Sequence, residues 1–383
     1  MSSYQVCLNG TPVHKSFYDQ LAALEIEENA DLPGAIAFTL PIAESNGDLT
    51  WVSDPTIGPF SNVTVTVTPD GSAPAQCIFD GYVLSHKVHA EPGITSSTVQ
   101  VWGRDASVLM ALEDKVNEWS GMTDGAVANQ IFANYGFASG PHNTDDDSPV
   151  HDPSAHTLMQ RASDWDFLRR LGRRTGKWCR VACRSVPGAR TGYFAAPDLG
   201  ADPVAQIVLN DPQNRSVTSL ELNWDVERPT SVHARQASLT NPDQDGTDAS
   251  TSDSGLPVLG APAQTLAAFS TQTFTAMLTA AADDTELPAL ARAVLRDAGW
   301  WLRAEGTADL AVLKTVLRVG DIVGIQGMGT MFSGNYVVWT VRHNITNESH
   351  SMAFTLVRNA VGHPPASAGA GAVNGAPSLP SLP

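Results

Sequence analysis

The sequence predicts a mainly β protein with α-helical insertions, arranged as two β-barrel domains around a helical middle region. Three observations support this prediction. The first hundred residues read as short strands separated by turns, and residues 105–200 change to helical patterns. A short motif from the first region then recurs near the C-terminal end, among further strand patterns. Two related strand-rich regions with helical material between them therefore account for the length of 383 residues.

The first region contains five predicted strands bounded by turn residues. Each run is β-branched or alternates in polarity, and turns such as Asp-Leu-Pro-Gly and Pro-Asp-Gly separate the runs. In one run Val63, Val65 and Val67 share a face and threonines occupy the other. Strands at this spacing are typical of a barrel or a sandwich. The five runs are residues 24–29, 34–42, 62–71, 77–88 and 97–105.

The middle region is predicted to hold three helices and a strand pair. A short helix covers residues 105–116, and a second covers 124–137. A capping box from Thr157 to Gln160 predicts the start of the third helix, which Gly176 ends. Its apolar stripe consists of Leu158, Ala162, Trp165, Leu168 and Leu171. The strands are residues 177–186 and 191–197.

The last third returns to strands, interrupted by one insertion. Strands are predicted within 206–240, followed by an acidic, Gly/Pro/Ser-rich mobile loop over 240–262. Helices are predicted over 263–283 and 286–304, the second with Pro288 in its first turn. Three more strand runs lie at 317–326, 332–345 and 350–359, and the Pro/Ala/Gly/Ser-rich end of the chain cannot form a core.

One internal echo connects the two strand-rich regions. The motif Phe-x-Gly, then Tyr-Val-aliphatic, then a histidine five residues later occurs twice, with one inserted residue. Its named positions are Phe79, Gly81 and Tyr82 in the first copy and Phe332, Gly334 and Tyr336 in the second. A strand that ends near an arginine follows each copy. The echo predicts two similar β-barrel units, one toward each end of the chain.

Composition and charge exclude several classes of protein. The net charge is −17 with only 16% charged residues, which opposes binding to nucleic acid or to an anionic membrane. No apolar run approaches the roughly 18–20 residues of a membrane helix. The N-terminus has no basic and apolar secretory pattern. The four cysteines are expected to be reduced, buried thiols of a protein made in the cytoplasm.

The search for an active site is mostly negative. No phosphate loop, nucleophile elbow or zinc-protease motif is present, and no cofactor is expected. The group at residues 145–147 with His151, Asp152 and His156 resembles metal ligands, but an acidic solvated loop is the favoured interpretation. Asp164 and Asp166 flank Trp165, and they fit helix-start electrostatics better than catalysis, since residues two apart on a helix diverge. The sequence thus predicts a protein that is not an enzyme.

A basic segment stands out against the acidic chain. Residues 161–190 contain nine bases and two acids, a net charge of +7, so the remainder carries −24. The favoured interpretation is a solvated face that pairs with the protein's own acids. The alternative is a docking surface for an acidic neighbour or the next subunit. The candidate docking residues are Arg169, Arg170, Arg173, Arg174 and Lys177.

The ordered set of segments resembles the phage late-control gene D tail proteins, the central baseplate hub family. The chain is also similar to the N-terminal hub part of the type VI secretion spike VgrG and to hubs of extracellular contractile injection systems. The likeness covers roughly residues 4–360. It rests on CIFDGYV with TVQVWGRDASVLMAL, on SDWDFLRRLGRRTGKW, and on LRVGDIVGIQ, MFSGNYVVWTVRHNI and FTLVRNA. The chain lacks the spike-type repeats of fused VgrG proteins, which indicates a separate hub.

The resemblance implies a structural homotrimer that adapts a six-fold tail tube to a three-fold spike. Its expected partners are further copies of itself, a spike protein, a tail tube or tube-initiator protein and other baseplate proteins. Neither nucleic acid nor membrane insertion is expected, and assembly in the cytoplasm would precede incorporation into a phage tail or injection particle. The predicted domains are two tube-like barrels at 1–112 and at 206–240 with 305–360, a helical domain at 113–205, a loop and helical insertion at 241–304, and a disordered tail at 361–383.

Two functions from other classes stay open at this point. One is a cytoplasmic β-rich enzyme acting on polysaccharide, which would need two carboxylates converging across a cleft. The other is a glycan-binding module that uses its tryptophans, although Trp119, Trp300 and Trp301 fit a core or a subunit contact better.

Overall fold

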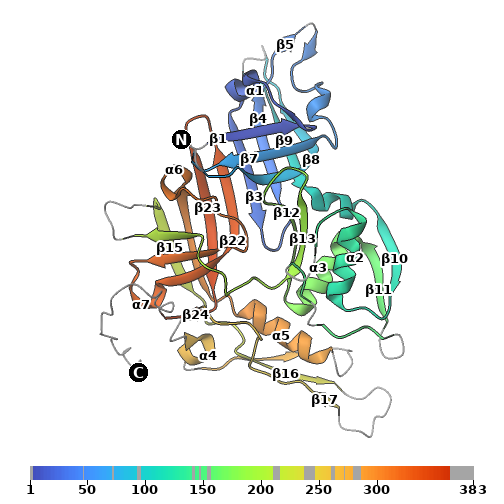
Figure 1. Ribbon diagram of the computed structural model, residues 1–383, viewed down its shortest axis with the longest axis vertical. Coiled ribbons are helices and arrows are strands. Elements are labelled where there is room, and N and C mark those ends of the chain that lie inside the picture. The colour runs from blue at the N-terminus through green and yellow to red at the C-terminus, as the bar shows by residue number, and fades with distance from the viewer. Residues whose placement is uncertain are drawn as a thin grey trace.

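The computed structural model shows a mainly β protein with a few short helices, as the sequence predicts (Figure 1). The structure describes residues 3–45, 47–70, 73–92, 96–139, 143–145, 148–152, 157–209, 216–236, 246–259, 264–270, 272–278 and 286–362. Within these ranges, every helix is too short or too polar to cross a lipid bilayer.

A sheet of 13 strands forms the centre of the molecule. Strands from the first third of the chain are β1 (Ser3–Leu8), β2 (Thr11–Pro12), β3 (Ala23–Asn29), β4 (Ala35–Pro41), β7 (Asn62–Thr68), β8 (Gln76–His89) and β9 (Thr98–Asp105). Later strands are β14 (Ala205–Val208), β15 (Ser219–Trp224), β20 (Leu302–Asp309), β21 (Ile322–Gln326), β22 (Gly334–Ile345) and β23 (His350–Arg358).

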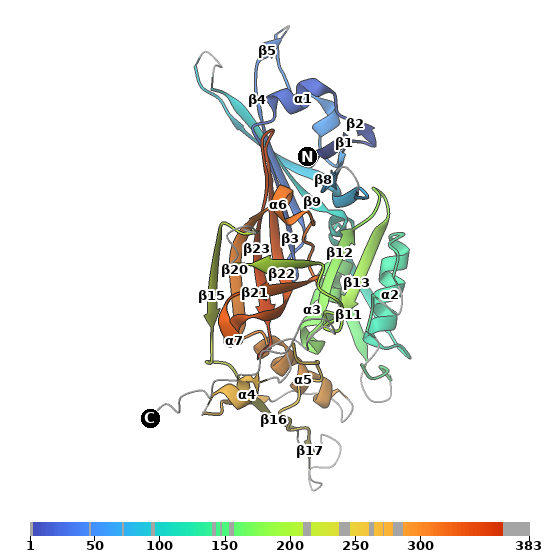
Figure 2. The same ribbon diagram turned by 60° about the vertical axis from the view of Figure 1, so that its left-hand side comes forward.

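Two five-stranded units with the same strand order make up most of this sheet. The first unit runs β3-β4-β9-β8-β7, and the second runs β15-β20-β23-β22-β21. Neighbouring strands within each unit are antiparallel. The two units share one sheet rather than forming separate sheets, because β22 of the second unit pairs with β3 of the first (Figures 1 and 2).

The sheet has one covered face and one open face. Alternate residues along each strand point to opposite faces, so Leu24 and Ile26 of β3 are buried while Glu25 between them is exposed. On the covered face, helices α1 (Lys15–Gln20) and α6 (Leu310–Leu313) contribute Phe17 and Leu310 to the main apolar core. Much of the open face carries small and polar side chains, together with the exposed Trp102, and Val357 at one end of it is buried in the main core.

An α/β insertion follows the first unit and has its own core. Its elements are the 3-10 helix η2 (Ala106–Ala111), β10 (Asp114–Trp119), α2 (Asp124–Asn134), β11 (Leu158–Ser163), α3 (Asp164–Thr175), β12 (Trp178–Cys183) and β13 (Arg190–Ala195). Phe132, Leu168 and Phe194 are buried in the second core. The predicted second helix and the predicted strand pair are present, and β12 and β13 are antiparallel.

One prediction for this region held only in part, and one was wrong. The short helix predicted over 105–116 is a 3-10 helix at Ala106–Ala111, and residues from Asp114 begin β10. The capping box was also misplaced: residues 158–163 form strand β11 against β10, and α3 begins at Asp164 with Ser163 as its N-cap. Leu158 and Ala162 gave a misleading signal, because a spacing of four places residues on one face of a strand as well as of a helix. Gly176 does end α3, with φ of 68°.

A second insertion precedes β20 and lies at the lower end of the molecule (Figure 1). It contains β16 (Ser231–Gln236), β17 (Thr247–Asp248), β18 (Gln264–Thr265), α4 (Leu266–Phe269), β19 (Thr275–Leu278) and α5 (Leu287–Ala298). The predicted helix over 286–304 is thus shorter, since residues from Leu302 belong to β20. The predicted helix over 263–283 was wrong, because its described part holds the strands β18 and β19 and only the short helix α4, with β19 paired to β16.

The predicted loop and tail also contain ordered residues. In the 240–262 loop, β17 pairs with β16 and Leu259 is buried in the main core. At the end of the chain, Val361 belongs to β24 (Ala360–Val361), which pairs with β18. Residues 240–245, 260–262 and 363–383 lie outside the described residues. The remaining short elements are β5 (Glu44–Ser45), β6 (Asp48–Leu49), η1 (Pro55–Ile57) and α7 (Gly329–Phe332).

The position of the α3 cap gives a direct test of this correction. The Ser163 hydroxyl accepts from the Asp166 N–H at 3.2 Å. We expect Ser163→Ala to lower the free energy of unfolding by about 1 kcal/mol, as loss of an N-cap does. Thr157→Ala should change it much less, because Thr157 lies before the strand. Urea unfolding of both variants measures the difference, and a larger loss for Thr157→Ala would contradict the assigned helix start.

Candidate functional site

The junction between the two units is the antiparallel pair of β22 and β3. Its register runs from Thr340 opposite Asn29 to Ile345 opposite Leu24. On the open face, Arg342 and Glu27 lie opposite each other and form an ion pair of 2.7 Å. This ladder makes the sheet continuous across the junction.

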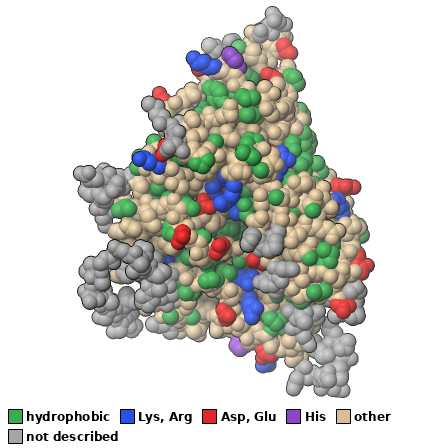
Figure 3. All heavy atoms as spheres, viewed as in Figure 1, with side chains coloured by type: hydrophobic (Ala, Val, Ile, Leu, Met, Phe, Trp, Pro, Cys, Tyr) green, Lys and Arg blue, Asp and Glu red, His purple; other side chains and the backbone are tan. Residues whose placement is uncertain are grey.

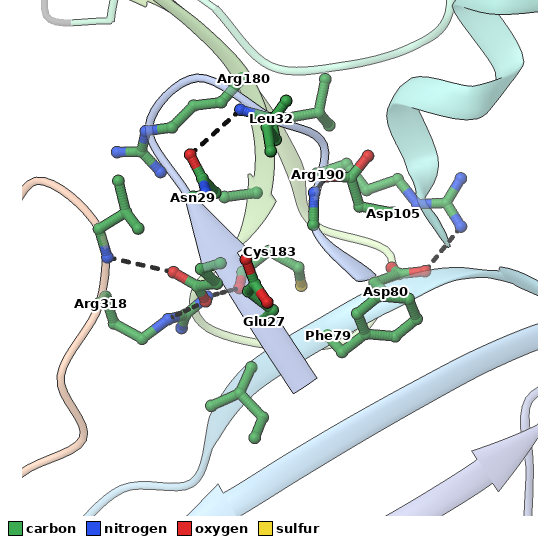
Figure 4. Close-up of a pocket in the computed structure, with 16 residues that line it drawn as sticks. Glu27, Asn29, Leu32, Phe79, Asp80, Asp105, Arg180, Cys183, Arg190 and Arg318 are labelled. Atoms are coloured by element: carbon green, nitrogen blue, oxygen red, sulfur yellow. Dashed lines mark hydrogen bonds and ion pairs between the residues drawn. The ribbon is translucent and has the colours of Figure 1, made fainter. Parts of the chain in front are cut away.

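Arg318 fixes the junction from the covered side. Its Nε donates to Glu28 Oε1 at 2.5 Å, its Nη1 to the Cys77 carbonyl at 2.8 Å and its Nη2 to the Cys183 carbonyl at 2.7 Å. One side chain of the second unit therefore holds β3, β8 and β12 together (Figure 4). Only 3% of the Arg318 side chain is exposed, so Glu28 supplies the charge that a buried guanidinium requires.

A second, partly buried arginine attaches the α/β insertion to the same place. Arg190 of β13 forms an ion pair of 2.7 Å with Asp80 of β8 and donates to the Tyr82 hydroxyl at 2.9 Å. The Gly188 N–H donates to the other Asp80 oxygen at 2.8 Å. A small cavity of about 30 Å³ lies between these groups and Arg318 (Figure 4). The junction is thus a packed contact with no room for a substrate.

The strand registers of the two units can be aligned residue by residue at one point. Both long strands contain a one-residue bulge, between Val83 and Ser85 in β8 and between Val338 and Thr340 in β22. Across from each bulge the ladder continues without a break in β9 and β23. The bulges therefore align Val83 with Val338.

Hydrogen bonds beside the bulges confirm this alignment. The Val83 N–H donates to the Ser61 carbonyl, and the Val338 N–H donates to the Asp321 carbonyl. The Val83 carbonyl accepts from the Phe60 N–H, and the Val338 carbonyl accepts from the Gly320 N–H. Phe60 and Gly320 both have positive φ, 58° and 88°. The same kind of turn thus directly precedes β7 in the first unit and β21 in the second.

Each unit has two strand edges. Of these four edges, two are joined to each other at the junction and two are free. Among the described strands, β15 pairs with β20 alone, so its outer edge is free. In β8, pairing with β7 ends at Tyr82, and residues 85–89 pair only with β9. These two free edges are the equivalents of the β3 and β22 edges that form the junction.

The free edges differ in charge and both expose apolar side chains. Residues 85–89 of β8 include Lys87 and two histidines, whereas Glu221 and Asp225 lie along β15. Val88 is 43% exposed and Trp224 is 48% exposed. Beside the β15 edge lies a groove of about 530 Å³, whose lining includes Trp224, Asp225, Arg228, Asp297, Trp300 and Trp339.

Elsewhere charged side chains are sparse. On the face in Figure 3 they are separated by neutral surface, and basic and acidic groups lie next to one another near the centre.

Comparison with protein families identifies the chain. The family model described as the Alg8 N-terminal domain matches residues 1–347. The chain belongs to the Alg8 N-terminal domain family. That description names no activity, and no curated protein matches the chain. The family has a different name from the late-control gene D proteins, so the likeness to that particular family stays a prediction.

Solved structures show where else this fold occurs. A tail protein from Neisseria meningitidis is 14% identical with a TM-score of 0.61, over 94% of this chain and 96% of that one. The 43 kDa tail protein of prophage MuSo2 from Shewanella oneidensis is 12% identical with a TM-score of 0.62, over 94% and 99%. An E. coli component of the type VI secretion system is 12% identical with a TM-score of 0.52, over 94% and 79%. At these identities the likeness shows the fold, which is that of tail proteins.

The predicted docking residues are mostly engaged within the chain. Arg169 donates to the Asp31 carbonyl, Arg170 to the Asp166 carbonyl and Lys177 to the Asp145 carbonyl. Arg174 forms an ion pair with Glu286, and only Arg173 and Arg170 are largely exposed. The helix therefore uses much of its charge to hold neighbouring elements, and docking to a partner stays a prediction.

The echo residues lie on equivalent strand pairs but not at equivalent positions. Phe79, Gly81 and Tyr82 belong to β8, whereas Phe332 ends α7 and Gly334 and Tyr336 belong to β22. Tyr82 directly precedes the aligned valine, while Tyr336 lies two residues before it. The tyrosines also differ in role, since Tyr82 binds Arg190 and Tyr336 donates to the Phe332 carbonyl at 2.8 Å.

The candidate metal and catalytic residues have structural partners. His151 is buried between Asp124 at 2.7 Å and Glu286 at 3.4 Å, and Asp145 accepts from the Ala196 N–H at 2.7 Å. Asp146, Asp147 and His156 lie outside the described residues. Among the residues that the structure describes, no group of three His, Cys, Asp or Glu could hold a metal ion.

The two carboxylates beside Trp165 do not converge on a cleft. Asp164 is buried and accepts from Lys115, Gln160 and Tyr135, whereas Asp166 lies at the α3 cap. Burial by itself raises the pKa of Asp164, but these three hydrogen bonds outweigh it and lower the pKa. A carboxylate held ionised in this way is a poor general acid.

Sequence reasoning missed the junction residues themselves. Arg318 lies in the run LRVGDIVGIQ, which predicted only a strand, and a single arginine carries no local signal of a buried contact. Phe60 was not singled out, although its equivalent Gly320 has the residue type that a positive φ favours. The alignment of the two bulges identifies the turn that holds Arg318 and the turn that holds Phe60 as equivalents. The bulges are visible only in the structure.

The first test at the junction removes the buried guanidinium. We expect Arg318→Met to lower the free energy of unfolding by about 3–5 kcal/mol, because it leaves Glu28 as an uncompensated buried charge. Arg342→Met is the matched control, since that ion pair is half exposed, and it should cost less than about 1 kcal/mol. Urea unfolding at one protein concentration measures both, and equal effects would contradict the clamp.

The second test follows the charge on His151. Burial lowers the pKa of His151, but the hydrogen bonds to Asp124 and Glu286 outweigh it and raise the pKa to about 9. Because this pKa exceeds the unfolded value of about 6.5, protonation stabilises the fold fully below pH 6.5 and is lost toward pH 9. We expect on the order of 3 kcal/mol to disappear across that window.

The control separates this effect from general pH dependence. His151→Gln should show a flat stability between pH 6.5 and 9, while the exposed His233→Gln should follow the unsubstituted protein. Chemical unfolding at several pH values measures the slope. A His151→Gln variant that keeps the full slope would refute the protonated state.

Proposed function

We propose that the protein is a structural baseplate hub of a contractile phage tail or a phage-like injection system. In this proposal it forms a homotrimer that adapts the six-fold tail tube to the three-fold spike. The tail-protein fold supports a place in such a particle. The observation that carries the proposal is that one chain contains two equivalent units, one closed junction and one complementary pair of free edges.

The closed junction gives the register of the open one. The bulges align residues 340–344 with 85–89. The strand registers through β9 and β4 in the first unit, and through β23 and β20 in the second, align Glu27 with Asn223. Since Arg342 lies opposite Glu27, Lys87 of one copy would lie opposite Asn223 of the next. By the same rule His89 meets Glu221, and Ser85 meets Asp225.

The side chains at this register suit each other. Lys87 would lie between Glu221 and Asp225, which are two residues to either side of its partner, as Arg342 lies near Glu27 and Glu25. On the covered face Val88 would contact Leu222, a half-buried residue that packs against the core. Opposite charges and apolar pairs across a ladder each contribute roughly 0.2–1 kcal/mol.

Repetition of this contact is head-to-tail, and a head-to-tail contact must close into a ring or grow as a filament. Three copies would supply six equivalent units around one axis, which matches the symmetry implied by the baseplate hub family. The open face would line the lumen, because much of it is small or polar, whereas most of the apolar core lies on the other face. Its small and polar residues include Ala37, Thr39, Thr340, Ala353 and Thr355.

The remaining parts of the proposal concern partners and domains. The barrels at 1–112 and at 206–240 with 305–360 would form the ring, and the helical domain at 113–205 and the insertion at 241–304 would brace its periphery. A spike protein, a tube or tube-initiator protein and other baseplate proteins would bind the ring, which is assembled in the cytoplasm. The proposed role is the one implied by the resemblance to the late-control gene D proteins.

The mass of the purified protein tests the proposal. We expect light scattering after size-exclusion chromatography to give about 122 kDa, three times the chain mass of 40.6 kDa. Electron microscopy of the same sample should show rings with six similar lobes. A strict monomer at the highest attainable concentration, with no rings, would contradict the proposed trimer.

A further inference from the structure

Phe60 is held in a backbone conformation that disfavours it, and its side chain remains exposed. Its φ is 58° and 49% of the residue is accessible. A left-handed conformation costs a residue with a Cβ roughly 1–2 kcal/mol. Its counterpart in the second unit, Gly320, avoids this cost and makes the same backbone hydrogen bond. The strained backbone at Phe60 is therefore only weakly compensated within its own chain, because about half of the residue stays accessible.

The counterpart turn shows which surface such a turn meets. At the closed junction, the turn Arg318–Asp321 contacts Glu28 of β3, because both Arg318 and the Val319 N–H donate to that carboxylate. The α/β insertion fills the space beyond it, so a Cβ on Gly320 would lie 3.2 Å from Arg180. Glycine is thus favoured there chiefly by its φ of 88°, because the nearby atom is the end of the flexible Arg180 side chain.

The open junction differs at both of these points. The strand alignment equates Glu28 with Trp224, an exposed aromatic residue on the free β15 edge. In the described chain no counterpart of β12 lies beside β15. The groove of about 530 Å³ begins at Trp224 and Asp225 and extends across the end of the sheet to Val357 of β23 and Trp339 of β22. Trp224 and Trp300 line this groove together with Asp225 and Arg228.

The geometry points to the groove beside β15 as the binding site for the Phe60 turn (Gly58–Ser61) of a second copy of this chain. The Phe60 ring would pack against Trp224, where aromatic pairs gain energy beyond area burial. Leu84, at the bulge beside this turn, is 37% exposed and would flank the contact. This inference rests on the proposed head-to-tail ring and names the residues that make its junction selective.

The occupant follows from the molecule itself. The turn and the groove lie next to the two free edges, which are the equivalents of the edges that the closed junction pairs. The same ladder that would join Lys87 to β15 would therefore bring Phe60 to Trp224. An aromatic pair at the open junction replaces the Arg318–Glu28 pair of the closed one. Because the two junctions use different side chains, pairing of the free edges between copies would be favoured over replacement of the closed junction by the open one.

The test compares two substitutions at Phe60 with one elsewhere. Phe60→Ala and Phe60→Gly should each weaken association by roughly 30-fold per junction, as loss of a half-buried phenyl group does. Phe60→Gly should also stabilise the dissociated chain against urea, because glycine relieves the positive φ. Phe274→Ala is the matched control, since Phe274 is 54% exposed on the second insertion, and it should change neither property.

A double-mutant cycle locates the partner. Sedimentation equilibrium of Phe60→Ala, Trp224→Ala and the double variant should show that the second substitution costs little once the first is present. If the unsubstituted protein forms trimers but Phe60→Gly associates equally well, or if the two effects simply add, the Phe60 contact is refuted while the proposed ring stands. If the unsubstituted protein never associates, both proposals fall.

Discussion

The antiparallel pairing of β22 with β3 is the contact on which the rest of the structure depends. It merges two units that are far apart in sequence into one sheet, and it sets the position of every strand on either side. Arg318 makes the pairing selective, because its three donors reach β3, β8 and β12 at once. A buried guanidinium with one carboxylate and two carbonyls tolerates few other arrangements. The α/β insertion is held to the same point through Arg190 and Asp80.

In the proposed ring, the internal duplication would extend this one contact to assembly. The free edges of β8 and β15 are the equivalents of the joined edges, so the closed junction would serve as the template of the contact between copies. The two junctions are similar in backbone but differ in side chains, with an ion pair buried in one and exposed aromatic residues at the other. In the proposed ring, such a division would keep the closed junction permanent and leave the open one to form between copies.

Much of the fold could be predicted from the sequence, and the failures have physical causes. Alternation in residues such as Val63, Val65 and Val67 predicted strands correctly, because one buried face requires a period of two. The start of α3 was missed because Leu158 and Ala162 fit a strand and a helix equally well. The internal echo pointed to the right pair of strands, yet the bulges shift the equivalent residues by one position. Arg318 and Phe60 act through partners distant in sequence, so no local pattern could reveal them.

Hydrogen exchange at the free edges tests the central claim, that the open junction repeats the closed one. The measurement compares outward-pointing backbone amides of β15 and of residues 85–89 in concentrated and dilute protein. We expect slow exchange in the concentrated sample and fast exchange on dilution, while amides between β20 and β23 stay protected in both. Fast exchange at both free edges in a sample that is fully assembled would contradict it, because the copies would then be joined by some other surface.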